Sequence, residues 1–182
     1  MARKEKFSKD ELLIKSVGFI RKFGIDNLNV RSLANYIGCS TQPIFRNYAN
    51  MDEFKLDLKK YLRNDYESFI SDYIDVNDYL LTISYAYALY AKKEFNIFKS
   101  LFVTDLAGSR TVDQVINTDR NRPTIEAMVK QYNISLIKAE SVYRDVRFYT
   151  HGIATQLCAK SIKLEDEEIY KLIKNMINLC LR

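Results

Sequence analysis

The chain has 182 residues, of which 47% are hydrophobic and 28% are charged, and its 5 Gly and 2 Pro exclude a disordered or loop-rich protein. No apolar run is long enough for a membrane span and no apolar signal region follows the charged N-terminus, so we expect a cytoplasmic protein without a membrane partner. The net charge of +5 lies entirely within residues 1–50, as expected for a module that meets a polyanion; a basic surface without a ligand is the alternative.

The first predicted helix runs from about Leu12 to Gly24. Ser8 and Glu11 have the spacing of a capping box, in which the serine hydroxyl accepts from the glutamate amide and the carboxylate binds the serine amide. Apolar residues then recur every three to four positions until Gly24, which is suited to end the helix.

A helix-turn-helix pattern follows. Asn29 is a favourable cap for a short second helix, and Gly38 ends that helix because glycine supplies the positive φ of a tight turn. After a link of three residues, Ser40 is expected to cap a third helix over residues 41–48. Asn50 has the same role for a fourth helix, with acidic residues in its first turn.

Together these elements resemble the tetracycline-repressor (TetR) family over about a quarter of the chain. The resemblance is carried by residues 12–24, 29–40, 44–48 and 50–56. It implies an all-α fold, with a three-helix DNA-binding domain in residues 1–50 and a helical bundle for ligand binding and dimerisation in residues 51–182. The sequence departs from the family pattern at Asn29, Phe45 and Met51, which replace a threonine, an aromatic residue with a hydroxyl and a lysine.

The third helix would be the recognition helix, whose N-terminal half enters the major groove. Gln42 fits bidentate pairing with adenine, and Thr41 or Pro43 fits a thymine methyl. Each such residue has an ordinary solvated helix position as its alternative, and Tyr48 equally fits packing. The expected base contacts are Thr41, Gln42, Pro43 and Arg46, and the expected backbone contacts are Asn29, Arg31, Ser40, Phe45, Asn47 and Tyr48.

Beyond residue 50 the sequence predicts helices separated by short polar breaks. We expect a linking helix over 51–73, a second from about 77, a short aromatic helix over 95–103, a loop over 108–122 with a helical turn at 112–116, and helices over 123–132, 135–161 and 165–181. The family resemblance implies that the last two pair with their copies in an intermolecular four-helix bundle.

Two sets of body residues are candidates for binding. Apolar spacing alone proves only a buried face, so an intramolecular core explains both sets equally well. The predicted dimer seam contains Tyr149, His151, Ile153, Leu157, Ile169, Ile173 and Met176. The predicted ligand pocket contains Tyr87, Phe98, Phe102, Met128, Tyr132 and Tyr143, with Arg147 as a polar anchor.

No motif for enzyme chemistry is present. The sequence has one histidine, no phosphate-binding glycine loop and no paired metal ligands, so we expect no catalytic residues, no metal site and no cofactor. Cys39, Cys158 and Cys180 lie far apart, which predicts reduced thiols, with redox sensing as the alternative.

The sequence therefore predicts a transcription regulator, expected as a repressor that binds a palindromic DNA operator as a homodimer. A small molecule or a protein bound in the C-terminal domain is expected to release or modulate it. The alternative is a protein-interaction module that uses the helix-turn-helix without reading DNA. An activator in place of a repressor also remains open.

Overall fold

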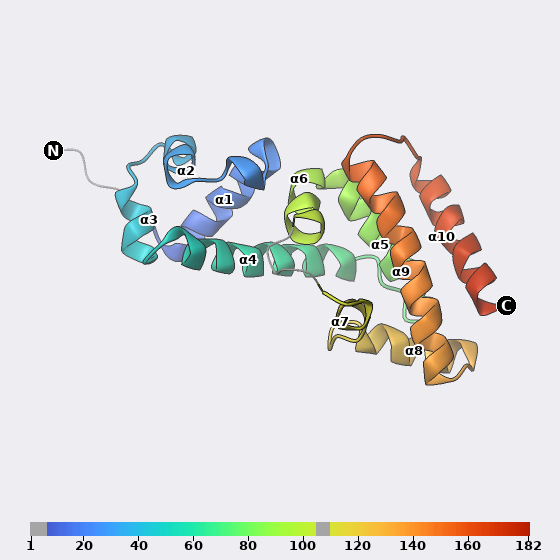
Figure 1. Cartoon of the computed structure of the whole chain (residues 1–182). Helices are drawn as coiled ribbons and strands as arrows, with labels where there is room; N and C mark the ends of the chain where they lie inside the picture. Colours follow the sequence, from blue (N-terminus) through green and yellow to red (C-terminus); the bar gives the residue numbers. More distant parts are fainter. Residues whose placement is uncertain (1–6, 105–109) are drawn as a thin grey trace. The chain divides into compact units, whose positions relative to one another are not determined.

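The computed structural model describes residues 7–104 and 110–182, and all of their regular secondary structure is helical (Figure 1). This confirms the predicted all-α fold. The chain forms two compact units: residues 1–67 with 94–104, and residues 68–93 with 105–182. The first unit thus continues past residue 50, the expected end of the DNA-binding domain, and takes in a segment that lies far along the chain.

The described part of the first unit consists of helices and helical turns. In chain order they are α1 (Lys9–Phe23), the 3₁₀ turn η1 (Ile25–Asn27), α2 (Val30–Ile37), α3 (Gln42–Asn47), most of α4 (Met51–Ser71), α6 (Phe95–Phe98) and the π-helical turn η2 (Lys99–Val103). Its core is apolar, and the fully buried side chains include Leu12, Ile20, Leu33, Ile44, Phe54 and Phe98.

Side-chain caps fix where three of these helices begin, as predicted. The Ser8 hydroxyl accepts from the Glu11 amide at 3.2 Å, and the Ser8 amide donates to the Glu11 carboxylate at 2.8 Å. Asn29 Oδ1 accepts from two amides in the first turn of α2, at 3.1 and 2.9 Å. Asn50 Oδ1 does the same for α4, at 3.0 and 2.9 Å.

The prediction that Ser40 caps the third helix is wrong. Thr41 occupies the cap position of α3, and it makes no side-chain hydrogen bond there. A capping side chain accepts a hydrogen bond from the backbone N–H two or three residues later. Three residues after Ser40 stands Pro43, which has no N–H to donate. The helix instead starts with a backbone bond from the Ile44 amide to the Thr41 carbonyl oxygen, at 3.2 Å.

Polar contacts hold the 94–104 segment within the first unit. The Arg21 guanidinium pairs with Glu94 at 2.9 Å and with Asp65 at 3.5 Å. Lys99 Nζ lies 2.6 Å from the Asp26 carboxylate. Arg21 and Glu94 are 73 residues apart, and so are Asp26 and Lys99. Local sequence patterns therefore cannot predict these two ion pairs.

The second unit is a helical bundle. It contains α5 (Tyr79–Lys93), α7 (Val112–Ile116), α8 (Arg122–Tyr132), α9 (Leu136–Cys158) and α10 (Asp166–Leu181), close to the predicted ranges. The first residues of the predicted loop, 108 and 109, lie outside the described part of the chain. Helices α5, α9 and α10 pack on one another, and α8 packs on α5 and α9 (Figure 1).

Four of the seven predicted seam residues belong to this bundle's own core. Ile153, Leu157, Ile169 and Ile173 are buried among residues of the same chain. A side chain that is already covered has no surface for a partner, so their assignment to a dimer seam is wrong and the intramolecular alternative holds. Tyr149, His151 and Met176 stay partly exposed.

No helix in residues 7–104 and 110–182 is long and apolar enough to span a membrane. The cysteines Cys39, Cys158 and Cys180 are free thiols, each partly buried.

Candidate nucleic-acid interface

Helices α2 and α3 follow one another across a tight turn that begins at Gly38. This residue has φ 80° and ψ 32°, the left-handed conformation predicted for it. Its amide and that of Cys39 both donate to the Ala34 carbonyl oxygen, each at 3.0 Å, which satisfies the end of α2. Leu33 and Ile44 are buried from the two helices, so the turn and the core fix α3 against α2.

The outer face of α3 carries the exposed side chains of the predicted recognition helix. Gln42, Phe45 and Arg46 are exposed, and Thr41 is partly exposed. Within the described residues, the side chains of Gln42 and Arg46 make no hydrogen bond or ion pair. An amide and a guanidinium with free donors are the groups that pair bidentately with adenine and guanine edges.

Three of the predicted contacts face the wrong way. Pro43 is buried, and Tyr48 is only 2% exposed, with its ring 5.2 Å from that of Phe54. Asn47 donates from Nδ2 to the carbonyl oxygens of Phe7 and Pro43, at 3.0 and 2.8 Å, so its donors are used within the protein. The assignments of Pro43 to a base contact and of Asn47 and Tyr48 to phosphate contacts are therefore wrong.

A signal for this inward face was present in the sequence. Pro43 and Asn47, and likewise Ile44 and Tyr48, are four residues apart and so share one side of a helix. Burial raises the pKa of the Tyr48 hydroxyl, which keeps it protonated. That hydroxyl is buried and has no hydrogen-bond partner among the described residues.

Other predicted backbone contacts remain available. Arg31 and Ser40 are exposed. Asn29 commits Oδ1 to the cap, while its Nδ2 makes only a long contact of 3.5 Å to Asn27. Phe45 is 51% exposed but offers no side-chain donor, and its amide bonds to Thr41 at 3.4 Å, so it can provide apolar contact alone.

The residues predicted to line a ligand pocket are divided between the two units. Phe98 and Phe102 belong to the first, where their rings lie 5.0 Å apart and Phe102 also packs on Tyr66. Met128 and Tyr143 are buried in the core of the second unit.

The remaining predicted pocket residues lie in the second unit, and each of them has a polar partner there. The Tyr87 hydroxyl lies 2.8 Å from His151 Nδ1. The Tyr132 hydroxyl donates to Asp78 at 3.4 Å, and burial followed by the Asp78 charge raises the pKa of Tyr132 to about 12. Arg147 is partly exposed on α9, and its guanidinium donates a hydrogen bond to the Tyr143 hydroxyl.

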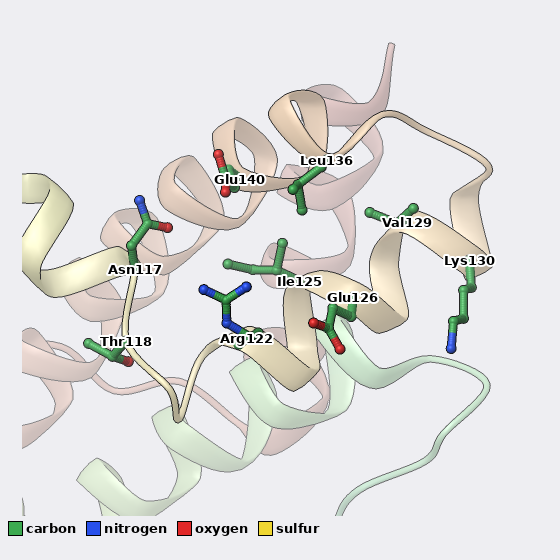
Figure 2. Close-up of a pocket in the computed structure, with 9 residues that line it drawn as sticks. All are labelled: Asn117, Thr118, Arg122, Ile125, Glu126, Val129, Lys130, Leu136 and Glu140. Atoms are coloured by element: carbon green, nitrogen blue, oxygen red, sulfur yellow. The ribbon is translucent and has the colours of Figure 1, made fainter.

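The second unit does contain a cavity of about 530 Å³, at a different place. It lies between α8, the turn before it and the first turns of α9 (Figure 2). None of the seven predicted pocket residues lines it, and no sequence signal marked it. The lining residues are Asn117, Thr118, Arg122, Ile125, Glu126, Val129, Lys130, Leu136 and Glu140.

No protein-family model and no curated protein matches this sequence.

In residues 7–104 and 110–182, no group of three or more His, Cys, Asp or Glu side chains is arranged to hold a metal ion. The exposed face of α3 carries an amide and a guanidinium, on Gln42 and Arg46, without hydrogen bonds or ion pairs in the described chain. Both groups have donors suited to hydrogen-bond base edges.

Proposed function

We propose that the chain is a sequence-specific DNA-binding transcription regulator, acting as a repressor that binds a palindromic operator as a homodimer. The observation that carries this proposal is the outer face of α3, where Gln42 and Arg46 are exposed and free of partners in the described chain. The resemblance of residues 12–56 to the TetR family and the excess positive charge of residues 1–50 support it.

In this proposal α3 lies in the major groove. Gln42 pairs with an adenine, Arg46 with a guanine or a phosphate, and the Thr41 methyl meets a thymine. Asn29, at the start of α2, and Arg31 bind phosphates, where exposed donors add to the positive end of the helix dipole. These backbone contacts set the register of α3 without adding sequence preference.

The homodimer forms on the outer faces of α9 and α10. Phe148 of α9 is 47% exposed and Leu179 of α10 is 61% exposed, and Met176 beside it is partly exposed. Exposed apolar side chains on two long packed helices favour burial against another helix pair. A two-fold dimer places its two recognition helices about 34–36 Å apart, one turn of duplex, which predicts an inverted repeat in the operator.

One observation favours the protein-interaction alternative. Phe23 and Tyr36 of the first unit are large, partly exposed aromatic residues whose rings lie 5.9 Å apart in an edge-to-face arrangement. Aromatic side chains of this kind are enriched in protein interfaces. A contact made by them would depend little on salt, whereas phosphate binding falls steeply as salt is added.

The decisive experiment is selection of bound sequences from a pool of random duplexes, with the full chain, at two salt concentrations. Recovery of an inverted repeat, with affinity that falls as salt rises, supports the proposal. Gln42→Ala is expected to relax the preference at one base position, by about 1–3 kcal/mol. Lys171→Gln, which removes an exposed charge on α10, is the control and should leave the selected sequence unchanged.

If no sequence is enriched and no salt-sensitive binding occurs, the DNA-reading proposal is wrong and the protein-interaction alternative takes its place. If Gln42→Ala weakens binding to every sequence equally, the assignment of Gln42 to base reading is wrong.

A further inference from the structure

One side of the cavity beside α8 is formed by a turn that hydrogen bonds hold in place. The turn before α8 is fixed by Asn121, whose Nδ2 donates to the carbonyl oxygens of Val115 and Ile116, at 2.9 and 2.8 Å. The Asn121 amide donates to the Thr118 hydroxyl at 3.3 Å, and the Arg122 amide to the Thr118 carbonyl at 3.1 Å. Because these bonds order the turn, this wall exists before any ligand binds, which lowers the cost of binding.

The middle of the cavity is apolar. Figure 2 shows the side chain of Ile125, from α8, extending toward that of Leu136, from the first turn of α9, with Val129 farther along α8. Leu136 is 50% exposed although it lines the cavity, so a ligand lying there would remove apolar surface from water. The volume of about 530 Å³ falls within the range of small-molecule sites.

A cation stands at one end of this apolar surface. Arg122 is exposed, and its guanidinium has no ion pair or hydrogen bond with any described residue. In Figure 2 it lies next to Ile125, on the side of Asn117 and Thr118. Lys130 lines the far end of the cavity, two turns along α8, and in the same view its ammonium group points away from Ile125. Arg122 is therefore the cation next to the apolar surface.

Two carboxylates limit how much negative charge the cavity accepts. Glu126 and Glu140 also line it, and neither has an ion pair among the described residues. A single carboxylate can bind Arg122 in the bidentate geometry that guanidinium favours. A second negative charge next to Arg122 would be repelled by Glu126 and Glu140.

We propose that this cavity binds an amphipathic organic monoanion, with its carboxylate on Arg122 and its hydrocarbon body against Ile125, Val129 and Leu136. The binding itself is independent of DNA; only the role of this ligand as the effector rests on the proposed function. The site differs from the aromatic pocket that the sequence suggested, since none of those residues lines it.

The test uses decanoate with the full chain, by titration calorimetry without DNA. Decanol and decylamine, which keep the hydrocarbon but are neutral and cationic, serve as matched ligands. Decanoate is expected to bind at least about tenfold more tightly than either one, because only it gains the charge-assisted bonds to Arg122. Inorganic phosphate, a dianion without an apolar body, is expected not to bind.

Variants locate the site. Arg122→Gln should weaken decanoate binding by about tenfold or more and remove the preference over decanol. Lys138→Gln is the matched control, since it removes an exposed charge on α9 that does not line the cavity, and it should bind decanoate as the wild type does. Glu126→Gln should strengthen binding by removing a repulsive charge. Circular dichroism establishes that each variant is folded.

Equal binding of decanoate and decanol, tighter binding of decylamine, or unchanged binding in Arg122→Gln overturns the proposal. So does an absence of decanoate binding to the folded wild type. Because no DNA is present, these outcomes are separate from failure of the DNA-reading proposal, which the duplex selection reports.

Discussion

Substitution of Gly38 probes the turn that orients α3. The backbone there has φ 80°, which residues with a side chain rarely adopt, and a Cβ built at this position has no heavy atom within 4 Å. The substitution Gly38→Ala therefore introduces no clash, and any change in stability comes from the backbone alone.

The expected loss of stability therefore comes from the backbone conformation at this position. Holding an L-residue in the left-handed region costs roughly 1–2 kcal/mol, and the lower freedom of alanine in the unfolded chain offsets part of it. We expect Gly38→Ala to lower the free energy of unfolding of the first unit by about 1 kcal/mol. Gly38→Asn should cost less, because asparagine tolerates this conformation better than alanine.

Gly152 provides a control of opposite sign. It lies inside α9, and a Cβ there also meets nothing within 4 Å. Since glycine is about 1 kcal/mol less favourable than alanine in a helix interior, Gly152→Ala should stabilise the second unit. Urea unfolding measured by circular dichroism, with hydrogen exchange to assign the change to α2 and α3 or to α9, gives both values. If Gly38→Ala proves as stable as the wild type, or Gly38→Asn less stable than Gly38→Ala, the backbone argument fails.

Other predictions concern the second unit. Ile173→Asp should unfold it, because Ile173 is 0% exposed and a buried charge without a partner is strongly destabilising. Leu179→Asp, at an exposed position, should leave it folded and yield monomers. A folded Ile173→Asp monomer, measured by sedimentation and circular dichroism, would contradict the core assignment. Burial, and then the Arg147 charge, lower the pKa of His151 below 6.5. The folded state therefore binds fewer protons than the unfolded one, so stability should be constant above pH 6.5 and fall as the pH drops below it; the slope should vanish in His151→Gln, and a slope that persists there assigns it to another group.

Local signals predicted much of the first unit correctly. The caps at Ser8, Asn29 and Asn50 and the left-handed glycine at Gly38 each depend on residues within four positions of one another. Such interactions can be found from sequence because the chain itself holds the partners together. The error at Ser40 arose where a second local rule, the missing N–H of Pro43, outweighed the first.

Nonlocal partners explain what the sequence could not predict. The 94–104 segment buries Ile97 and Phe98 in the first unit, and Arg21 with Glu94 and Lys99 with Asp26 form ion pairs at its surface. The residues on either side of each one in the sequence do not predict its partner. The cavity beside α8 has a nonlocal origin too. Its lining comes from the turn before α8, from α8 and from the first turns of α9, and only the packing of these elements brings the lining residues together.

The predicted seam residues on α10 show why apolar spacing alone does not identify a dimer interface. On α10, Ile169, Ile173 and Ile177 lie four apart and are buried in the chain's own core, whereas Met176 and Leu179 lie on a more exposed face. In both sets the residues recur every three or four positions, so the sequence pattern alone does not distinguish the two faces of the helix. The predicted seam drew from both. Only packing separates them, and it leaves the exposed set as the surface that a second copy of the chain can cover.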